Sequence, residues 1–320
     1  LGQTARDRRQ EHVVDLPGRD RTSEEAPAGS RCVDYHAPDE TRTTAAMTLV
    51  GYVIRGLARW FQRVGDVFRR VANLLYGFLP ALLPPAELTA GLGKYYASVY
   101  TERFVPWAEE ALQDGLEAWE IEVLDRYQLR KGRMLVLGSG WGREALAIAR
   151  RGVSVVGIDT NEAAVRTAQR RADAAGVPAR FHRASFLNLP YRSAAWDYVL
   201  MSRSMYSATP GAKARQSLLA GLVRVLKPEG LLILSFLPEQ RPVSRSKRLA
   251  TSMNRRLVKL PGANPSYQVG DGCIAGHFLH AFQDEAEISG ELRGAGVVVR
   301  EINWPRGFAV VAAPSSRPCR

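Results

Sequence analysis

Three glycines and one aspartate are spaced as in sites that bind a nucleoside-like ligand. Gly138, Gly140 and Gly142 directly follow a short apolar run, and Asp159 stands nineteen residues after Gly140, at the end of the apolar run 153–158. Glycines let the backbone approach a ligand closely, and a carboxylate accepts hydrogen bonds from ribose hydroxyls. The pattern therefore predicts a β-α-β unit whose glycine turn and acidic tip hold a ribose-containing cofactor.

The spacing of the glycines separates two classes of ligand. Dinucleotide-binding proteins favour G-x-G-x-x-G, whose third glycine lets helix and strand pack closely beneath a pyrophosphate. Here Arg143 takes the place of that third glycine, and Gly142 comes one residue earlier. This departure disfavours an NAD(P)-dependent oxidoreductase. A glycine turn that holds no ligand is a further alternative.

The loop resembles the first motif of class I S-adenosylmethionine-dependent methyltransferases, in particular those that act on small molecules. The resemblance covers about two thirds of the chain, residues 95–313, and includes a Lys-Pro-Glu-Gly turn at 227–230 and a late stretch at 276–282. It implies an enzyme that uses S-adenosylmethionine as its cofactor. The acceptor atom, whether oxygen, nitrogen or carbon, stays open.

The resemblance also implies which residues bind that cofactor. The glycine loop would hold the methionine part, the acid after the second strand the ribose, and the stretch after the third strand the adenine. This chain has Ser185 where the family usually has aspartate, which puts one adenine contact in doubt, and the backbone N–H of Phe186 could serve instead. The implied set is Gly138, Ser139, Gly140, Gly142, Asp159, Thr160, Ser185, Phe186 and Ser202.

Residues for the chemical step are less well marked. Methyl transfer from a sulfonium has a good leaving group, so positioning supplies much of the rate and a weak base, or none, is needed. The weak candidates for that base are Tyr206, His277 and His280, each with a structural role as the alternative. The candidates for substrate contact are Tyr95, Tyr96 and Arg203. No pair of the three cysteines has metal-ligand spacing, and no metal is expected.

Strand-like and helical patterns alternate along the chain and must position these residues. The expected fold is α/β: a Rossmann-like, doubly wound, seven-stranded sheet, mostly parallel with a C-terminal antiparallel hairpin, plus an N-terminal amphipathic helix. Ligands of such sheets bind at the carboxyl ends of the strands. Strands are expected at 134–137, 153–158, 179–182, 196–201, 231–236, 297–302 and 308–312.

Composition divides the chain into segments. The 320 residues are 46% apolar and 24% charged, which is ordinary globular composition. Residues 1–46 are poor in apolar residues and are predicted to be a disordered or non-native leader. Residues 47–85 form an amphipathic helical segment. Residues 86–320 form the methyltransferase domain, which carries an insertion at 238–276.

The segment 50–79 predicts a long amphipathic helix, because apolar residues recur every three or four positions with arginines between them. Three interpretations stay open: packing on the main domain or a partner subunit, peripheral contact with a membrane, or a targeting presequence. No segment reaches the roughly 20 apolar residues that a spanning helix needs. A cytoplasmic protein, with peripheral membrane association as an option, is therefore expected.

The net charge of +12 indicates an anionic partner. Seven of the positive charges lie in 241–259, a stretch without any acid. A solvated loop, a phosphate or carboxylate clamp and a nucleic-acid contact all fit this stretch, although the missing aromatic residues disfavour single-stranded RNA. We therefore expect a methyltransferase for a small molecule. The alternatives are an RNA methyltransferase and a cofactor-binding scaffold without catalysis.

Overall fold

The computed structural model describes residues 40–99, 115–240, 245–274 and 277–315. The chain divides into two compact units, Leu1–Phe61 and Gln62–Arg320, and α1 (Glu40–Tyr76) has residues in both. This helix begins at Glu40 rather than at residue 50, so the last part of the predicted leader is helical, and the rest lies outside the described residues. No helix in the described part of the chain is both long and apolar enough to cross a bilayer.

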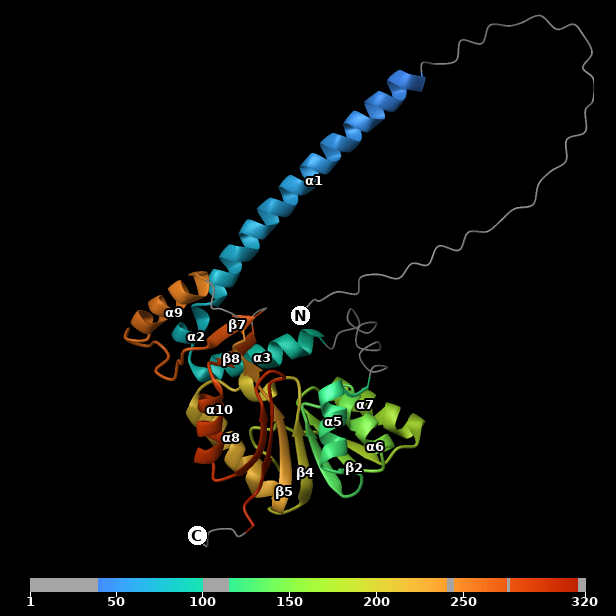
Figure 1. Cartoon of the computed structure of the whole chain (residues 1–320), viewed down its shortest axis with the longest axis vertical. Helices are drawn as coiled ribbons and strands as arrows, with labels where there is room; N and C mark the ends of the chain where they lie inside the picture. The colour runs from blue at the N-terminus through green and yellow to red at the C-terminus, as the bar shows by residue number, and fades with distance from the viewer. Residues whose placement is uncertain (1–39, 100–114, 241–244, 275–276, 316–320) are drawn as a thin grey trace, which may run out of the picture. The chain divides into compact units, whose positions relative to one another are not determined.

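A seven-stranded sheet forms the centre of the second unit (Figure 1). The strand order is β3-β2-β1-β4-β5-β10-β9; the first five strands are parallel, and β10 is antiparallel to both of its neighbours. This arrangement confirms the predicted fold class. The strands are β1 (Arg133–Leu137), β2 (Ser154–Asp159), β3 (Ala179–Arg183), β4 (Trp196–Met201), β5 (Leu226–Ser235), β9 (Val298–Asn303) and β10 (Phe308–Ala312).

Helices cover both faces of this sheet, because successive strand residues point to opposite sides. In β1, Met134 and Val136 join one buried cluster, and Leu135 and Leu137 join the other. The first cluster lies under α5 (Ala118–Arg126), α6 (Arg143–Arg150) and α7 (Glu162–Ala175), and the second under α8 (Ala212–Val225) and α10 (Glu285–Gly294). Two apolar layers therefore hold the sheet and fix the strand ends where the site lies.

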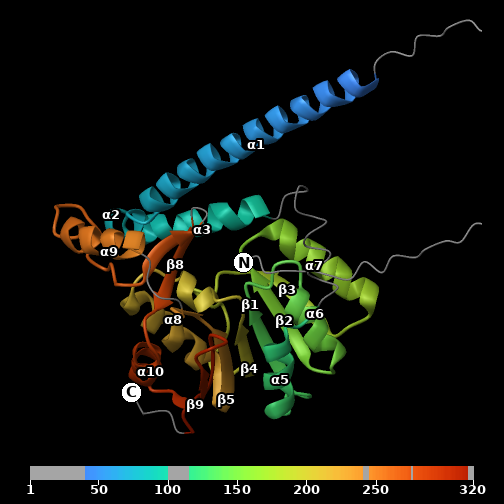
Figure 2. The same cartoon turned by 45° about the horizontal axis from the view of Figure 1, so that its top comes forward.

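The predicted insertion contributes β7 to a second, smaller sheet, which the sequence did not indicate and whose other two strands lie at the two ends of the insertion. Its strand order is β6-β8-β7. Helices pack against this sheet at the carboxyl end of the large one, and we call the whole group the cap (Figure 2). The cap consists of β6 (Leu237–Pro238), β7 (Asp271–Ile274), β8 (His277–Phe282), α2 (Leu79–Leu82), α3 (Pro85–Val99) and α9 (Arg245–Leu257). The short 3-10 helix η2 (Met205–Ala208) lies beside β8.

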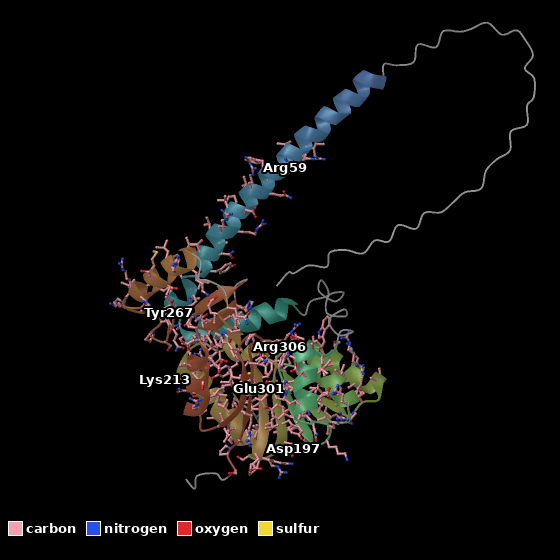
Figure 3. The ribbon with its side chains drawn as sticks, in the orientation of Figure 1. Arg59, Asp197, Lys213, Tyr267, Glu301 and Arg306 are labelled. Atoms are coloured by element: carbon pink, nitrogen blue, oxygen red, sulfur yellow. The ribbon has the colours of Figure 1, made fainter. Side chains whose placement is uncertain are left out.

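The expected turn at 227–230 lies inside β5, and this expectation was wrong. The strand begins at Leu226, which pairs with Trp196, and the register shifts before Tyr198. Glu229 absorbs the shift with a φ of +60°. Lys227 anchors this bulge through an ion pair of 2.6 Å with Asp197, which lies at the end of the sheet away from the cap (Figure 3).

Candidate functional site

The glycine loop joins β1 to α6, and its three glycines all have positive φ: +60° at Gly138, +51° at Gly140 and +93° at Gly142. Residues other than glycine rarely adopt this left-handed region of backbone conformation. Space is short as well, because a Cβ at Gly138 would lie 2.3 Å from the sulfur of Met205. The left-handed conformation therefore favours glycine at Gly138, and an added Cβ would also force the end of the Met205 side chain to shift.

The carboxylate of Asp159 ties this loop to the end of β2. The Gly140 N–H donates to its Oδ2 at 2.9 Å, and the Asn161 N–H donates to its Oδ1 at 2.8 Å. Burial raises the pKa of Asp159, and these backbone donors oppose that rise. Each carboxylate oxygen has a second lone-pair site. The acid can therefore shape the loop and still accept a hydrogen bond from a ribose hydroxyl.

The loop and the tip of β4 lie at the point where the strand order reverses, between β1 and β4. Open α/β sheets bind ligands in the crevice at that point. Ser139 is buried there, and among the described residues its hydroxyl meets no hydrogen-bond partner. A buried hydroxyl without a partner suits a polar ligand. The loop and Asp159 fit the predicted cofactor.

The remaining predicted cofactor residues follow β2, β3 and β4. Thr160 is exposed next to Asp159. Ser185 and Phe186 are half-buried after β3, and the Ser185 Oγ accepts from the Leu187 N–H at 3.2 Å. Ser202 is buried at the end of β4. The sheet thus brings all nine predicted positions to its carboxyl edge, on four neighbouring loops.

Sequence reasoning missed a buried carboxyl at this edge. Glu120 of α5 accepts from the Ser202 hydroxyl, from Arg143 Nη2 at 3.1 Å and from the Glu117 N–H at 2.7 Å. Burial raises its pKa to about 7, assisted by the negative charge of Glu144. A signal was present, because Glu120 shares the apolar face of its helix with Val123 and Leu124.

The contacts of Arg143 account for an arginine at the position where the dinucleotide pattern has its third glycine. Its guanidinium contacts the Gly115 carbonyl at 2.8 Å, Glu120 at 3.1 Å and Glu144 at 2.6 Å. Arg203, predicted to contact substrate, is exposed at the tip of β4, where it donates to Glu117 at 3.2 Å. Arg203 and the next residue both have positive φ, +58° and +54°. Left-handed residues other than glycine are uncommon and cluster at functional sites.

Tyr206, a candidate base, is fully buried in η2. Its hydroxyl donates to Glu291 at 2.8 Å, and its ring stacks on Phe282 at 5.9 Å. Burial raises the pKa of Tyr206, and the Glu291 charge raises it further. Arg215 is also fully buried and donates two hydrogen bonds to Glu291. These contacts favour the structural role that the sequence left open.

The two candidate histidines lie in β8 of the cap. His280 is fully buried, with Nδ1 2.7 Å from Asp271 and Nε2 3.1 Å from Glu287. Burial alone would lower the pKa of His280, but the hydrogen bonds to these carboxylates raise it. His277 is buried as well, and burial lowers its pKa. His280 has both nitrogens occupied, so its contacts also favour a structural role.

The predicted tyrosines of α3 and the three cysteines add little to the described site. Tyr95 and Tyr96 belong to α3, but their side chains lie outside the described residues. Cys32 and Cys319 also lie outside, and Cys273 is a free thiol whose pKa burial raises to about 11. Within the described ranges, no group of three or more His, Cys, Asp or Glu side chains could hold a metal ion.

The site region matches a known family. Residues 134–230 match the family model described as a methyltransferase domain. A demethylmenaquinone methyltransferase of Thermus thermophilus is 37% identical over 109 residues, which are 33% of this chain and 48% of that protein. An uncharacterized protein of Haemophilus influenzae is 31% identical over 104 residues, 32% of this chain and 41% of that protein. The chain thus spans less than half the length of these relatives.

The fold has solved counterparts. One is the 1,6-didemethyltoxoflavin-N1-methyltransferase of Burkholderia thailandensis, solved with bound 1,6-didemethyltoxoflavin and S-adenosylhomocysteine. It superposes with a TM-score of 0.52 at 19% identity, and the match covers 73% of this chain and 92% of that chain. At this identity the likeness concerns the fold.

Proposed function

Because residues 134–230 belong to the class I S-adenosylmethionine-dependent methyltransferases, as predicted, we propose that this protein transfers a methyl group from S-adenosylmethionine to a small-molecule acceptor. The observation that carries the proposal is the hydrogen bonding of the Asp159 carboxylate to the glycine loop. Asp159 holds the Gly140 and Asn161 N–H groups and keeps lone pairs for a ribose. S-adenosylmethionine supplies the activated methyl group when bound.

The protein's own residues act by positioning. The glycine loop, Ser139, Asp159 and Ser202 hold the cofactor at the carboxyl edge, and the cap above that edge shields the acceptor from water. No base is assigned: the contacts of Tyr206 and His280 favour structural roles, and no step is given to His277, whose pKa is lowered by burial. Holding two reactants in line can by itself supply about 7–11 kcal/mol of the barrier. The acceptor would therefore be bound close to the sulfonium and require little proton transfer.

Calorimetry with S-adenosylmethionine tests the cofactor site. We expect Asp159→Ala to weaken binding at least tenfold, about 1.4 kcal/mol, because the loop loses its tie and the ribose its acceptor. Asp159→Asn should weaken it less, and Asp173→Ala, at an exposed aspartate of α7, should leave binding unchanged. Preference for NAD(H), or no binding at all, would overturn the proposal.

Transfer itself is tested with a labelled methyl donor. A small-molecule extract should become labelled by the wild type and not by Asp159→Ala. Labelling of RNA without labelling of any small molecule would contradict the small-molecule acceptor. If the labelling of RNA also falls steeply as salt is raised, an RNA methyltransferase is favoured. Intact cofactor binding without turnover on either extract would favour a scaffold without catalysis.

The proposal also places the protein at a membrane surface through α1. This helix carries exposed large apolar side chains along one stripe, with arginines on the other side. A helix of this kind can lie in the interface between water and lipid. Support comes from the exposure of Trp60, Phe61, Val67, Phe68, Val71 and Leu75.

A further inference from the structure

The basic part of the insertion, which the sequence left open, folds into α9 with two distinct faces. Ala250 and Asn254 lie buried against the rest of the cap. At the border of this buried face, Leu249 is 56% and Met253 is 42% exposed, one helical turn apart. Exposed basic side chains lie on the side away from the buried face: Arg248, Arg255, Arg256 and, after the helix, Lys259. The helix therefore exposes apolar and basic side chains together.

The cap holds α9 firmly in this orientation. The Asn254 amide donates to the Gly77 carbonyl at 2.8 Å and reaches the hydroxyl of Tyr267, labelled in Figure 3, at 3.5 Å. Nearby, the buried Asn264 donates from its side chain to the Pro80 carbonyl at 2.8 Å and from its backbone to the Ala81 carbonyl at 2.9 Å. These hydrogen bonds join α9 and its following loop to the segment that begins where α1 ends.

The end of α1 therefore lies next to α9, as Figures 1 and 2 both show. Between Gln62 and Tyr76 this helix exposes Phe68 to 70%, together with Val71 and Leu75 on the same side. The next helix adds Leu82, which is 43% exposed. Two elements separated by about 170 residues of sequence thus present apolar side chains within one region.

We propose that α9 and the adjoining 67–82 segment form one docking surface for an anionic lipid bilayer. This inference rests on the membrane contact proposed for α1. It gives the basic insertion the role of binding anionic lipid headgroups. The apolar side chains would enter the interface, while the arginines and Lys259 meet the phosphate groups. Charge complementarity supports this occupant, because residues 245–260 contain no acid.

Lipid fits this surface better than nucleic acid does. Proteins that bind single strands interleave basic residues with aromatic side chains on which bases stack. Residues 245–260 contain no aromatic residue, and exposed Leu249 and Met253 occupy the places between the arginines. Apolar side chains of this type gain free energy from the acyl boundary and none from a phosphate backbone.

Vesicle flotation of the full chain tests the proposal. Phosphatidylcholine vesicles containing about one third phosphatidylserine should bind the wild type, and vesicles of phosphatidylcholine alone should bind it far less. Each basic side chain near such a surface is worth about a fivefold factor in affinity. We expect R248E/R255E/R256E/K259E to lower affinity for the anionic vesicles at least about a hundredfold. L249S/M253S should lower it on both vesicle types.

Matched controls separate the outcomes. K131E/R150E reverses two exposed charges outside the cap and should leave flotation unchanged. F68S/V71S/L75S tests α1 alone: loss of binding in this variant, with full binding in the α9 variants, would overturn the present inference and leave the α1 contact standing. Unchanged flotation in every variant, or an oligonucleotide that displaces the vesicles through α9, would also overturn it. Cofactor calorimetry on each variant checks folding and keeps this result separate from the methyl-transfer proposal.

Discussion

At the scale of single residues, the site depends on backbone conformation and on buried charge. Gly138 combines a left-handed backbone with contact to Met205, and Asp159 uses its carboxylate to shape the loop. Glu120 joins the same edge from a helix that the motif does not include. Each of these features makes a separate and measurable prediction.

Gly138→Ala is expected to lower the free energy of unfolding by about 2–3 kcal/mol, because left-handed strain adds to the displacement of the Met205 side chain by the new Cβ. Gly176→Ala is the matched control. Gly176 has a φ of +62°, but nothing lies within 4 Å of an added Cβ, so about 1 kcal/mol is expected. Urea unfolding measures both. Equal losses would contradict the steric argument, and Met205→Ala should partly rescue the first variant.

Glu120 is expected to make stability depend on pH. Its folded pKa of about 7 lies above the usual 4.5, so the folded state binds its proton more tightly than the unfolded chain does. The free energy of unfolding therefore falls as pH rises from about 4.5 to 7, by at most about 3 kcal/mol. Glu120→Gln should remove this slope, and Glu162→Gln, at an exposed glutamate, should keep it. Equal slopes in Glu120→Gln and wild type would contradict the assignment.

At the scale of elements, one buried polar network joins η2, α8 and α10 to the cap. Tyr206 and Arg215 both hold Glu291, and Arg215 also donates to Gln268 at 2.8 Å. The Gln268 N–H in turn donates to Asp271, the partner of His280. This chain of contacts places Tyr206 and His280, two candidate bases, in the framework of the fold.

Tyr206→Phe distinguishes framework from catalysis. We expect the loss of one buried hydrogen bond to lower the free energy of unfolding by about 1–2 kcal/mol, while Arg215 still neutralises Glu291. The rate of methyl transfer should stay within about twofold of the wild type, because the hydroxyl already donates to Glu291. Thermal unfolding and labelling assays measure the two effects. A large loss of rate with unchanged stability would assign Tyr206 to catalysis instead.

At the scale of the whole molecule, Gln62–Arg320 is expected to behave as one cooperative unit, because Arg215, which pairs with Glu291 beside the large sheet, also donates to Gln268, and Gln268 donates to Asp271 of the cap. Arg215→Met leaves the buried Glu291 without its positive partner and only with the Tyr206 hydroxyl, at a cost of about 3–5 kcal/mol. Hydrogen exchange should then accelerate first in β7 and β8 and later in β1 and β2. Uniform acceleration across both sheets would contradict this linkage. Glu291→Gln in the same chain should restore part of the protection.

The sequence alone determined the alternation of strands and helices, the glycine loop and the acid at the tip of β2. These features follow from local rules: apolar periodicity, the conformational freedom of glycine and the short connection between neighbouring strands. The turn at 227–230 escaped these rules, because pairing of Leu226 with Trp196 extends β5 through it.

Only the tertiary structure decided which distant side chains meet. Glu120 reaches Ser202 across 82 positions, Arg215 reaches Glu291 across 76, and Asn254 reaches Gly77 across 177. Such pairs have no local signature, because they depend on how amphipathic faces pack after the sheet has formed. The open alternatives for Tyr206 and for the basic insertion share this cause: residue type was visible in the sequence, and the neighbours that give it a role were not.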